Sequence, residues 1–297
     1  MSGKRRYFEG VDYCLLGIWI DNKSFGQLEE LTSILFEDFG LSIGLSRDPR
    51  KNWGLVASPL SAGIARFGQT PESLPSQLGL SKFSYCLISQ RLDDTSESSD
   101  LVLYRGSSSD AKTPSLSYTP FRKNPSNNSA LREFYYVDLL KVFVGIPENN
   151  ANGNGGTIVD SGSTVTSMEK PIFDAMATAF EAEMGNFSRA SVDVETSNGS
   201  NLLCFNITGL KFEKIKFPEL TFEFKGWAKL EFLVVNYFVP FDVDNSSLVC
   251  LTIVTDSTLD SDGPAIILGN TQLQNFYVEF DLENDRFGFW IQTCNKK

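Results

Sequence analysis

The sequence of 297 residues contains no histidine. Histidine supplies the general base of Ser-His-Asp and Cys-His hydrolases, and its imidazole ring is a common zinc ligand. Both catalytic classes are therefore excluded, together with every zinc site that uses imidazole. We expect neither a metal nor a cofactor.

Long apolar runs are also missing, because the sequence has no stretch of about 18 consecutive apolar residues, the length that a membrane span needs. Near the N-terminus, residues 4–6 are basic and precede an apolar run over residues 11–20. Glu9 and Asp12 interrupt that approach, and no small-residue cleavage site follows it. We expect no membrane span and no signal peptide, and we interpret this terminus as a chain that starts inside a domain.

Positively charged residues are fewer than negatively charged ones. The sequence has 26 lysine and arginine residues and 37 aspartate and glutamate residues, which gives a net charge of −11. Binding to phosphate groups needs a basic surface, so nucleic acid is excluded as a partner. The acidic balance fits a protein that works in acidic fluid. With 41% apolar content, a chain of 297 residues can bury one large core or two lobes.

Cysteine is scarce, and its odd number, five, leaves one residue to be explained. Five cysteines are compatible with an oxidising compartment, and the alternative is five buried free thiols in a cytosolic protein. Asn-X-Ser/Thr sequons can be glycosylated only in a secretory route, although some arise by chance. Six sequons favour secretion, and they begin at Asn22, Asn127, Asn186, Asn198, Asn206 and Asn245.

The most informative stretch covers residues 155–164, Gly-Gly-Thr-Ile-Val-Asp-Ser-Gly-Ser-Thr. Its β-branched residues suit a buried strand, and the strand delivers Asp160 into a turn of small and hydroxyl residues. Hydroxyl and backbone N–H donors stabilise a charged carboxylate. We therefore expect this turn to hold Asp160 ionised, so that it can act as a base or share a proton with a second acid. Alone, an Asp-Ser-Gly turn is also a common way to end a strand.

Three blocks give that turn its context. Residues 63–87 contain Gly-Ile-Ala-Arg-Phe-Gly, Ser-Leu-Pro-Ser-Gln-Leu and Phe-Ser-Tyr-Cys-Leu, and residues 157–166 surround the acid. Residues 264–294 contain Ala-Ile-Ile-Leu-Gly-Asn and then Asn-Phe-Tyr-Val-Glu-Phe-Asp. Together these blocks resemble the pepsin-like aspartic proteases (peptidase family A1) of the plant nepenthesin type. The resemblance runs from about residue 57 to the C-terminus.

The resemblance implies an all-β, bilobal pepsin-like acid protease fold with a complete C-terminal lobe and a partial N-terminal lobe. Residues 1–56 match no motif and form a divergent N-terminal segment. Residues 57–125 correspond to the partial first lobe, and residues 130–297 to the second lobe. Between them, residues 122–130 are rich in Lys, Asn, Pro and Ser, as expected of a lobe boundary.

In that family, two carboxylates hold one proton and one water molecule between them, because like charges so close cannot both ionise. The resemblance makes Asp160 the second-lobe acid. It makes Ser161 the hydroxyl that bonds to the other lobe, while Gly162 permits the turn and Ser163 bonds to the acid. It also implies an element that passes behind the turn, formed by Ile267, Leu268 and Gly269.

The resemblance further implies the disulfides Cys204–Cys250 and Cys86–Cys294, which leaves Cys14 without a partner. Each closes a long loop and stabilises the fold by roughly 3 to 5 kcal/mol if unstrained.

The first catalytic loop of the family, Asp-Thr-Gly-Ser, and the flap tyrosine are both absent from this sequence. The nearest imitation of the loop is Phe-Glu-Asp-Phe-Gly at residues 36–40, where Phe39 lacks the hydroxyl that the lobe-to-lobe bonds need. We therefore do not expect Asp38 to be catalytic. Arg66 also stands where the family has a glycine behind the first loop, which fits a lobe without that loop.

Three hypotheses follow. The chain belongs to an acid endopeptidase but carries only the second aspartate, through truncation or an altered transcript, and is inactive alone. Alternatively, it is an inactive relative that binds or inhibits a protein, like the cereal xylanase inhibitors of this fold. In the third hypothesis, two copies of the chain associate, and each contributes its Asp160 to one shared site. We expect a peptide or protein as the partner, a monomer, and a secreted, vacuolar or cell-wall location by family.

Apolar spacing predicts the main elements. We expect an amphipathic helix over residues 171–184 and a short helix over residues 71–78. A flexible loop is expected over residues 149–156. Strands are expected over residues 83–87, 134–144, 202–207, 220–224, 230–235, 248–254 and, as a hairpin with one apolar face, 276–281 with 287–291.

Overall fold

The computed structural model describes the chain in several stretches. The described residues are 18–19, 64–65, 67–71, 73–89, 99–106, 113, 115–123, 129–145, 148–150, 155–190, 202–243, 245–255 and 263–294.

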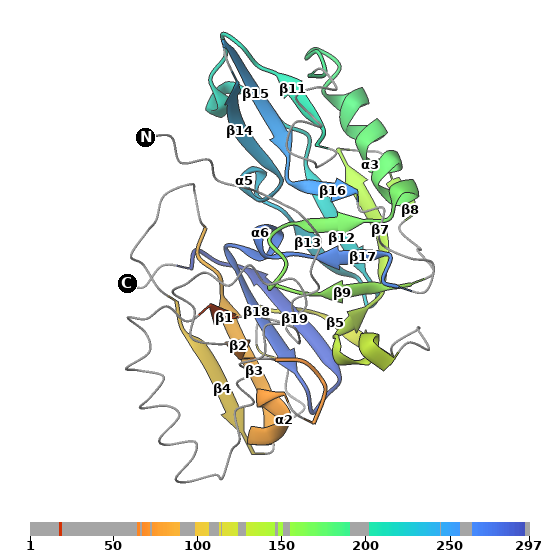
Figure 1. Ribbon diagram of the computed structural model, residues 1–297, viewed down its shortest axis with the longest axis vertical. Coiled ribbons are helices and arrows are strands. Elements are labelled where there is room, and N and C mark those ends of the chain that lie inside the picture. Colours follow the sequence, from red (N-terminus) through yellow and green to blue (C-terminus); the bar gives the residue numbers. More distant parts are fainter. Residues whose placement is uncertain are drawn as a thin grey trace, which may run out of the picture.

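A ten-stranded sheet runs through the middle of the molecule (Figure 1). Most of its strands are antiparallel, but β9 and β17 run parallel, as do β10 and β16. In spatial order the strands are β16 (Ile253–Thr255), β10 (Thr166–Met168), β17 (Ile266–Leu268), β9 (Thr157–Val159), β6 (Tyr136–Val137), β5 (Ser117–Arg122), β19 (Arg286–Ile291), β18 (Phe276–Asp281), β3 (Leu80–Cys86) and β4 (Leu101–Arg105).

Three smaller sheets complete the strand inventory of the described residues. A four-stranded sheet has the order β13 (Ala228–Glu231), β12 (Leu220–Phe224), β7 (Leu139–Val144) and β8 (Glu148–Asn150). A three-stranded sheet has the order β11 (Cys204–Asn206), β15 (Ser246–Leu251) and β14 (Phe238–Val243). The last pairs β1 (Ile18–Trp19) with β2 (Ile64–Ala65). The expected all-β class is confirmed.

The helical elements are few and mostly short. They are α2 (Leu74–Leu78), α3 (Lys170–Glu183), α5 (Val234–Tyr237), α6 (Asn270–Leu273) and the 3-10 turns η1 (Ser129–Glu133) and η2 (Phe212–Lys214). The predicted amphipathic helix is confirmed as α3, which buries Phe173, Met176 and Phe180 and packs on β7 and β16. α2 begins at the Ser73 cap and ends at Gly79, which adopts a left-handed conformation that glycine accepts readily.

The segments assigned to separate lobes share one sheet, because β3 from the first pairs with β18 from the second. Tyr277 lies opposite Cys86 at one end of this pairing and Asp281 opposite Lys82 at the other. A disulfide joins Cys86 to Cys294, and a second joins Cys204 to Cys250, as the resemblance implies. The first bond ties the partial first lobe to the end of the second lobe.

The single strand predicted over residues 134–144 is wrong, because the structure divides it at Asp138 into β6 and β7, which lie in different sheets. The Asp138 carboxylate binds Arg122 at 2.9 Å and Lys225 at 3.4 Å. Its carbonyl accepts a hydrogen bond from the Lys225 N–H at 2.9 Å. Arg122 and Lys225 thus fix the backbone at Asp138, where the chain passes from one sheet to the other.

Three further expectations are corrected. The strand expected over residues 230–235 ends at Glu231 as β13, and residues 234–237 form α5, whose Tyr237 hydroxyl donates to the Pro218 carbonyl. The strand expected over residues 248–254 breaks at Thr252, whose hydroxyl donates to the Asn236 carbonyl at 3.0 Å. Glu148–Asn150 forms β8 rather than the start of a flexible loop, because it pairs with β7.

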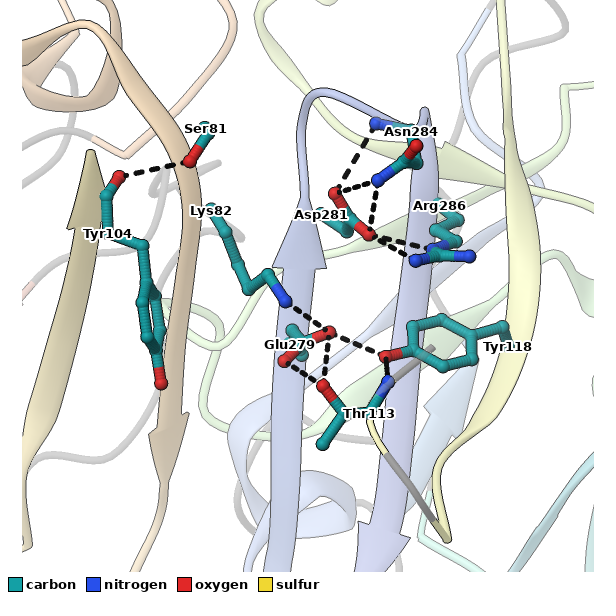
Figure 2. Close-up of polar contacts among 9 residues, drawn as sticks. All are labelled: Ser81, Lys82, Tyr104, Thr113, Tyr118, Glu279, Asp281, Asn284 and Arg286. Carbon is teal, nitrogen blue, oxygen red and sulfur yellow. Dashed lines mark hydrogen bonds and ion pairs between the residues drawn. The ribbon is translucent and has the colours of Figure 1, made fainter. Parts of the chain in front are cut away.

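The hairpin of β18 and β19 is confirmed, but the expectation of only one apolar, buried face is incomplete. Phe276, Val278 and Phe280 are buried as expected, yet Glu279 and Asp281 on the opposite face are buried too. Figure 2 shows the groups that surround these two acids. Burying a charge is costly unless it is paired, so this face must supply partners.

Each buried acid of β18 has several partners (Figure 2). Asp281 accepts from Arg286 through Nε and Nη2, both at 2.7 Å, and from the Asn284 side chain. Glu279 accepts from the Tyr118 hydroxyl at 2.6 Å and from the Thr113 hydroxyl. Lys82 lies 3.4 Å from Glu279. The acids on this face are therefore compensated by cations and hydroxyl donors.

Two features are absent from the described part of the chain. None of its helices has the length and apolarity required to cross a membrane. Within the same stretches, no group of three or more His, Cys, Asp or Glu side chains is placed to hold a metal ion.

Candidate active site

Asp160 lies directly after β9, at the point where that strand runs beside β17. The two strands are parallel, with Ile267 opposite Ile158 and Leu268 opposite Val159. The Asp160 N–H donates to the Leu268 carbonyl at 2.9 Å, which continues the pairing by one residue. Two buried, β-branched or aliphatic strands thus fix the start of the turn.

The Asp160 carboxylate binds donors from its own turn. Oδ1 accepts from the Gly162 N–H at 2.9 Å, and Oδ2 accepts from the Ser163 hydroxyl at 2.8 Å. The Ser163 N–H also donates to the Asp160 carbonyl at 3.2 Å. The structure therefore brings both Gly162 and Ser163 to the acid, as donors from its own turn.

The expectation that these donors hold Asp160 ionised is not met. Burial raises the pKa of Asp160 from its ordinary value of 3.8 to about 6, against the opposing effect of hydrogen bonds from Ser163 and Gly162. Only 1% of the residue is exposed, so removal of water from the charged form outweighs the donors. Below pH 6 the carboxyl group is mostly protonated, and it is then a proton donor rather than a base.

Gly269 lies where β17 passes closest to the turn. A Cβ atom there would lie 2.3 Å from the Val165 carbonyl oxygen, which no side chain can tolerate. Its N–H donates to the buried Thr166 hydroxyl at 3.0 Å. The structure thus places Ile267, Leu268 and Gly269 behind the Asp160 turn, and close backbone approach explains the glycine.

Asn270 and Thr271 also hold the turn, and sequence reasoning did not select them. The Asn270 side chain donates to the Ser161 carbonyl at 3.1 Å, and its N–H donates to the Ser163 carbonyl at 2.7 Å. The Thr271 hydroxyl donates to the Thr164 carbonyl at 2.7 Å. The signal in the sequence was the asparagine that follows Gly269 in the Ile-Leu-Gly-Asn block, since a turn rich in carbonyls needs donors nearby.

Tyr85 on β3 is a second residue that sequence reasoning missed. Its hydroxyl donates to the Ser161 hydroxyl oxygen at 3.1 Å, and both residues are buried. Burial raises the pKa of Tyr85 further above its ordinary value of 10.0, so the group stays protonated and remains a donor. The resemblance implies that the Ser161 hydroxyl bonds to the first catalytic loop. In this structure it bonds to a tyrosine of the partial first lobe.

A small cavity of about 10 Å³ adjoins Asp160. Its lining is mostly aromatic and comes from both lobes, with Phe67, Phe83, Phe134, Tyr135 and Phe280 around the acid. A volume of this size is close to the least that holds one water molecule. It does not admit a peptide.

Within the described ranges, no second carboxylate is among the hydrogen-bond partners of Asp160. Its oxygens bind only the donors of its own turn. Asp38, Arg66 and Cys14 lie outside the described residues. The described site therefore consists of one buried acid, its donors and an aromatic cavity.

Comparison with known proteins identifies relatives for most of the chain. Residues 135–290 match the family model described as xylanase inhibitor C-terminal. Aspartyl protease family protein 2 of Arabidopsis thaliana is 31% identical over 86% of this chain and 49% of its own length. Aspartic proteinase nepenthesin-1 of Nepenthes gracilis is 30% identical over 78% of this chain and 50% of its own length. This chain thus spans about half the length of these curated relatives.

Solved structures share the fold at lower sequence identity. The crystal structure of edgp has a TM-score of 0.61 at 23% identity and covers 82% of this chain and 62% of its own. Basic 7S globulin from soybean has a TM-score of 0.60 at 18% identity, with the same two coverages of 82% and 62%. At such identities the likeness concerns the fold alone.

Proposed function

Because this chain belongs to the pepsin-like aspartic protease family, we propose that it carries one half of an acid endopeptidase site, with Asp160 as the second-lobe acid. The observation that carries this proposal is the Asp160 turn, which binds the carboxylate from Gly162 and Ser163 and is backed by Gly269. The substrate is a peptide or protein, cleaved at acid pH only once a second carboxylate is supplied.

Hydrolysis by this family's chemistry needs two acids in different protonation states. One removes a proton from the attacking water molecule while the other donates a proton to the peptide carbonyl oxygen. Asp160, with its pKa raised to about 6, suits the donor role in acidic fluid. A single aspartate cannot fill both roles at once, so the chain alone cleaves no peptide bond.

The cavity beside Asp160 supports this conclusion independently. Its volume of about 10 Å³ holds at most a water molecule, and Phe83, Tyr135 and Phe280 form part of its wall. A peptide reaches Asp160 only if these aromatic residues separate from it. The arrangement therefore supports a site that is incomplete in geometry as well as in chemistry.

The test is cleavage of a denatured protein at pH 3 to 5 by the purified full chain, with and without pepstatin, beside an Asp160→Ala variant. We expect no turnover from any of these samples. We expect pepstatin-sensitive turnover when the N-terminal half of nepenthesin-1 is added to the chain, and none when it is added to the variant. If the chain alone cleaves the protein and the Asp160→Ala substitution abolishes that cleavage, the site already contains both acids and the proposal is wrong.

A second candidate function is binding without catalysis. The matched family model is described as a xylanase inhibitor domain, and the fold neighbours include a globulin, Basic 7S globulin from soybean. A buried, unassisted Asp160 favours this candidate as much as the first one. In this case the surface of the second lobe, rather than the acid, recognises a protein.

Inhibition separates the two candidates. If the chain is an inhibitor-like protein, adding it to an endo-xylanase lowers xylan hydrolysis, and the Asp160→Ala variant inhibits equally well. If the chain is a half-protease, xylanase activity is unchanged at every chain concentration, while complementation with a first lobe yields proteolysis.

We also propose that the chain passes through the secretory route to an extracellular or vacuolar compartment and works there as a monomer. The disulfides Cys86–Cys294 and Cys204–Cys250 support an oxidising compartment, where such bonds persist. Recovery of both bonds in chain purified from a plant apoplast or vacuole tests this, and recovery of free thiols in a cytosolic fraction opposes it.

A further inference from the structure

Three of the sequons lie within the described residues, and the fold brings all three together. Asn186 follows α3, Asn206 ends β11, and Asn245 lies in the turn between β14 and β15. The other three, at Asn22, Asn127 and Asn198, lie outside the described residues. Figure 1 places the ends of β11, β14 and β15 at one end of the long axis of the molecule.

Hydrogen bonds connect the three sequons directly. The Asn206 N–H donates to the carbonyl of Ser188, the last residue of the Asn186 sequon, at 2.8 Å. The N–H of Ser247, the last residue of the Asn245 sequon, donates to the Thr208 hydroxyl at 3.0 Å. The Ile207 N–H donates to the Ser247 carbonyl at 2.8 Å. The Asn206 sequon thus joins the other two into one cluster.

The asparagine side chains of the cluster are available for modification. Asn186 and Asn245 are exposed, and Asn206 is half-buried. The Asn206 oxygen accepts the Thr208 N–H at 2.9 Å, while its amide nitrogen makes no hydrogen bond among the described residues. The reactive nitrogen of the sequon is the atom that the fold leaves open.

One apolar side chain, Phe241, is exposed at the β14 edge of the three-stranded sheet, although Leu248 and the two cysteines beside it are buried. Asn206 lies opposite Leu248, and Leu248 lies opposite Phe241, so the three side chains form a row on one face. The Cys204–Cys250 disulfide lies on this same face, because residues two apart on a strand point the same way. Phe241 remains 44% exposed, and it lies on β14, an edge strand of the sheet within the described residues.

We propose that Asn186, Asn206 and Asn245 carry N-linked oligosaccharides that together form a sugar cap over this end of the three-stranded sheet and its exposed β14 edge. In each case a bond forms between the asparagine Nδ2 and the anomeric carbon of an oligosaccharide donated by a polyisoprenyl diphosphate. The bond from that carbon to the diphosphate oxygen breaks, Nδ2 loses one proton, and the lipid diphosphate leaves. A bulky, hydrophilic cover shields an exposed edge strand and an apolar side chain from association.

The cap leaves the candidate site open. Figure 1 shows β9, the strand that precedes Asp160, near the middle of the molecule, and the three-stranded sheet that carries the Asn206 sequon toward one end of its long axis. The proposal therefore stands whether the chain is a half-protease or a binding protein.

Occupancy is tested on the full chain secreted from a eukaryotic host. Digestion of its peptides with peptide-N-glycosidase in ¹⁸O-labelled water converts each glycosylated asparagine into a labelled aspartate, which mass spectrometry detects. We expect label at Asn186, Asn206 and Asn245. Absence of label at any of the three in the folded, secreted chain overturns the cap as proposed.

The role of the cap is tested with matched variants. The triple variant Ser188→Ala, Thr208→Ala and Ser247→Ala removes the three sequons and leaves every asparagine in place. The control Ser188→Thr, Thr208→Ser and Ser247→Thr keeps all three. From the secretory host, we expect at least a twofold larger sedimenting fraction for the alanine variant than for the control.

A host that does not glycosylate separates the sugar from any effect on folding. There the two triple variants should sediment alike, because neither carries sugar. A twofold difference that persists in that host, or no difference in the secretory host, shows that sugar does not protect the β14 edge.

Discussion

On one face of the central sheet, Asp281 and Glu279 are buried beside Arg286 and Lys82 (Figure 2). On the other face, Asp160 is equally buried, but among the described residues its carboxylate bonds to a hydroxyl and a backbone N–H and to no cation. Strand β18 contributes to both faces. Phe280 lines the cavity beside Asp160, whereas Glu279 and Asp281, its neighbours on the strand, point to the opposite face. One chain therefore contains buried acids with and without a cation.

The difference separates structural acids from a candidate chemical one. A buried carboxylate beside a guanidinium is neutralised, and it serves the fold when its other hydrogen bonds are also satisfied. A buried carboxylate without a cation has its pKa raised, which is a common property of catalytic acids. The pKa of Asp160, raised to about 6, places it in the second group.

The largest expected effect concerns the paired face. Replacing Arg286 by methionine removes the cation from Asp281, of which 0% is exposed, and leaves a buried carboxylate uncompensated. We expect a loss of about 3 to 5 kcal/mol in the free energy of unfolding, measured by urea denaturation. The control is Lys170→Met, which breaks the exposed Lys170–Asp174 pair and should cost under about 0.5 kcal/mol. Equal losses in the two variants would remove the contrast between the faces.

The pH dependence of stability tests the unpaired face. The folded chain binds a proton at Asp160 with a pKa of about 6, whereas the unfolded chain has the ordinary aspartate pKa of 3.8. Between these values the folded state holds more protons than the unfolded state, so the free energy of unfolding falls as pH rises. The difference between the two pKa values corresponds to about 3 kcal/mol of stability. This contribution is fully present below pH 3.8 and is lost above pH 6.

An Asp160→Asn variant isolates this contribution from all other titrating groups. Its free energy of unfolding is subtracted from that of the unmodified chain at each pH between about 3 and 7. We expect the difference to decline by about 3 kcal/mol across this range. Parallel curves would mean that Asp160 titrates in the folded chain as it does in the unfolded one.

Backbone closeness behind Asp160 gives a smaller effect. In a Gly269→Ala variant, the new Cβ meets the Val165 carbonyl oxygen at 2.3 Å, so β17 or the turn must shift. We expect a loss of about 1 to 3 kcal/mol in thermal or urea unfolding. In the control Gly185→Ala, the new Cβ lies 3.3 Å from the Ala182 carbonyl oxygen, a contact that a much smaller shift relieves, so the loss of stability should be smaller. A neutral Gly269→Ala substitution would contradict the close approach.

The smallest effect concerns Tyr85. A Tyr85→Phe variant loses the hydrogen bond to Ser161, and we expect a destabilisation of about 1 kcal/mol. Tyr237→Phe is the matched control, because it removes another buried tyrosine hydroxyl bond, to the Pro218 carbonyl, and Tyr237 does not line the cavity beside Asp160. The carboxyl pKa of Asp160 should move in Tyr85→Phe but not in Tyr237→Phe. An unchanged pKa in both variants would show that Tyr85 does not position the turn.

Much of the fold could be predicted because strong local patterns agreed with it. The apolar spacing of residues 171–184 required a helix, and the alternation from Phe276 to Ile291 required a hairpin. Sequence patterns could not place Asp138, because a change of sheet depends on Arg122 and Lys225, which are distant in the sequence. Sequence patterns also could not show that the polar face with Glu279 and Asp281 is buried. Alternation shows which residues share a face, but it does not show what covers that face.

The candidate site was predictable in its residues but not in its chemistry. Asp160, Gly162 and Ser163 lie together as expected, because the donors are local to the turn. The protonation state was wrongly inferred from those donors, since burial is a property of the whole fold and outweighs them. Tyr85 was missed for the same reason, because it reaches Ser161 from another strand.

The central claim is that Asp160 is a buried acid with no second carboxylate among its partners in the described part of the chain. The most direct measurement is a ¹³C NMR titration of the Asp160 carboxyl carbon in the full chain, assigned by its loss in the Asp160→Asn variant. We predict one titration step with a midpoint near pH 6. Two coupled steps, as two carboxylates that share a proton give, or a single midpoint below about 4, would contradict the account.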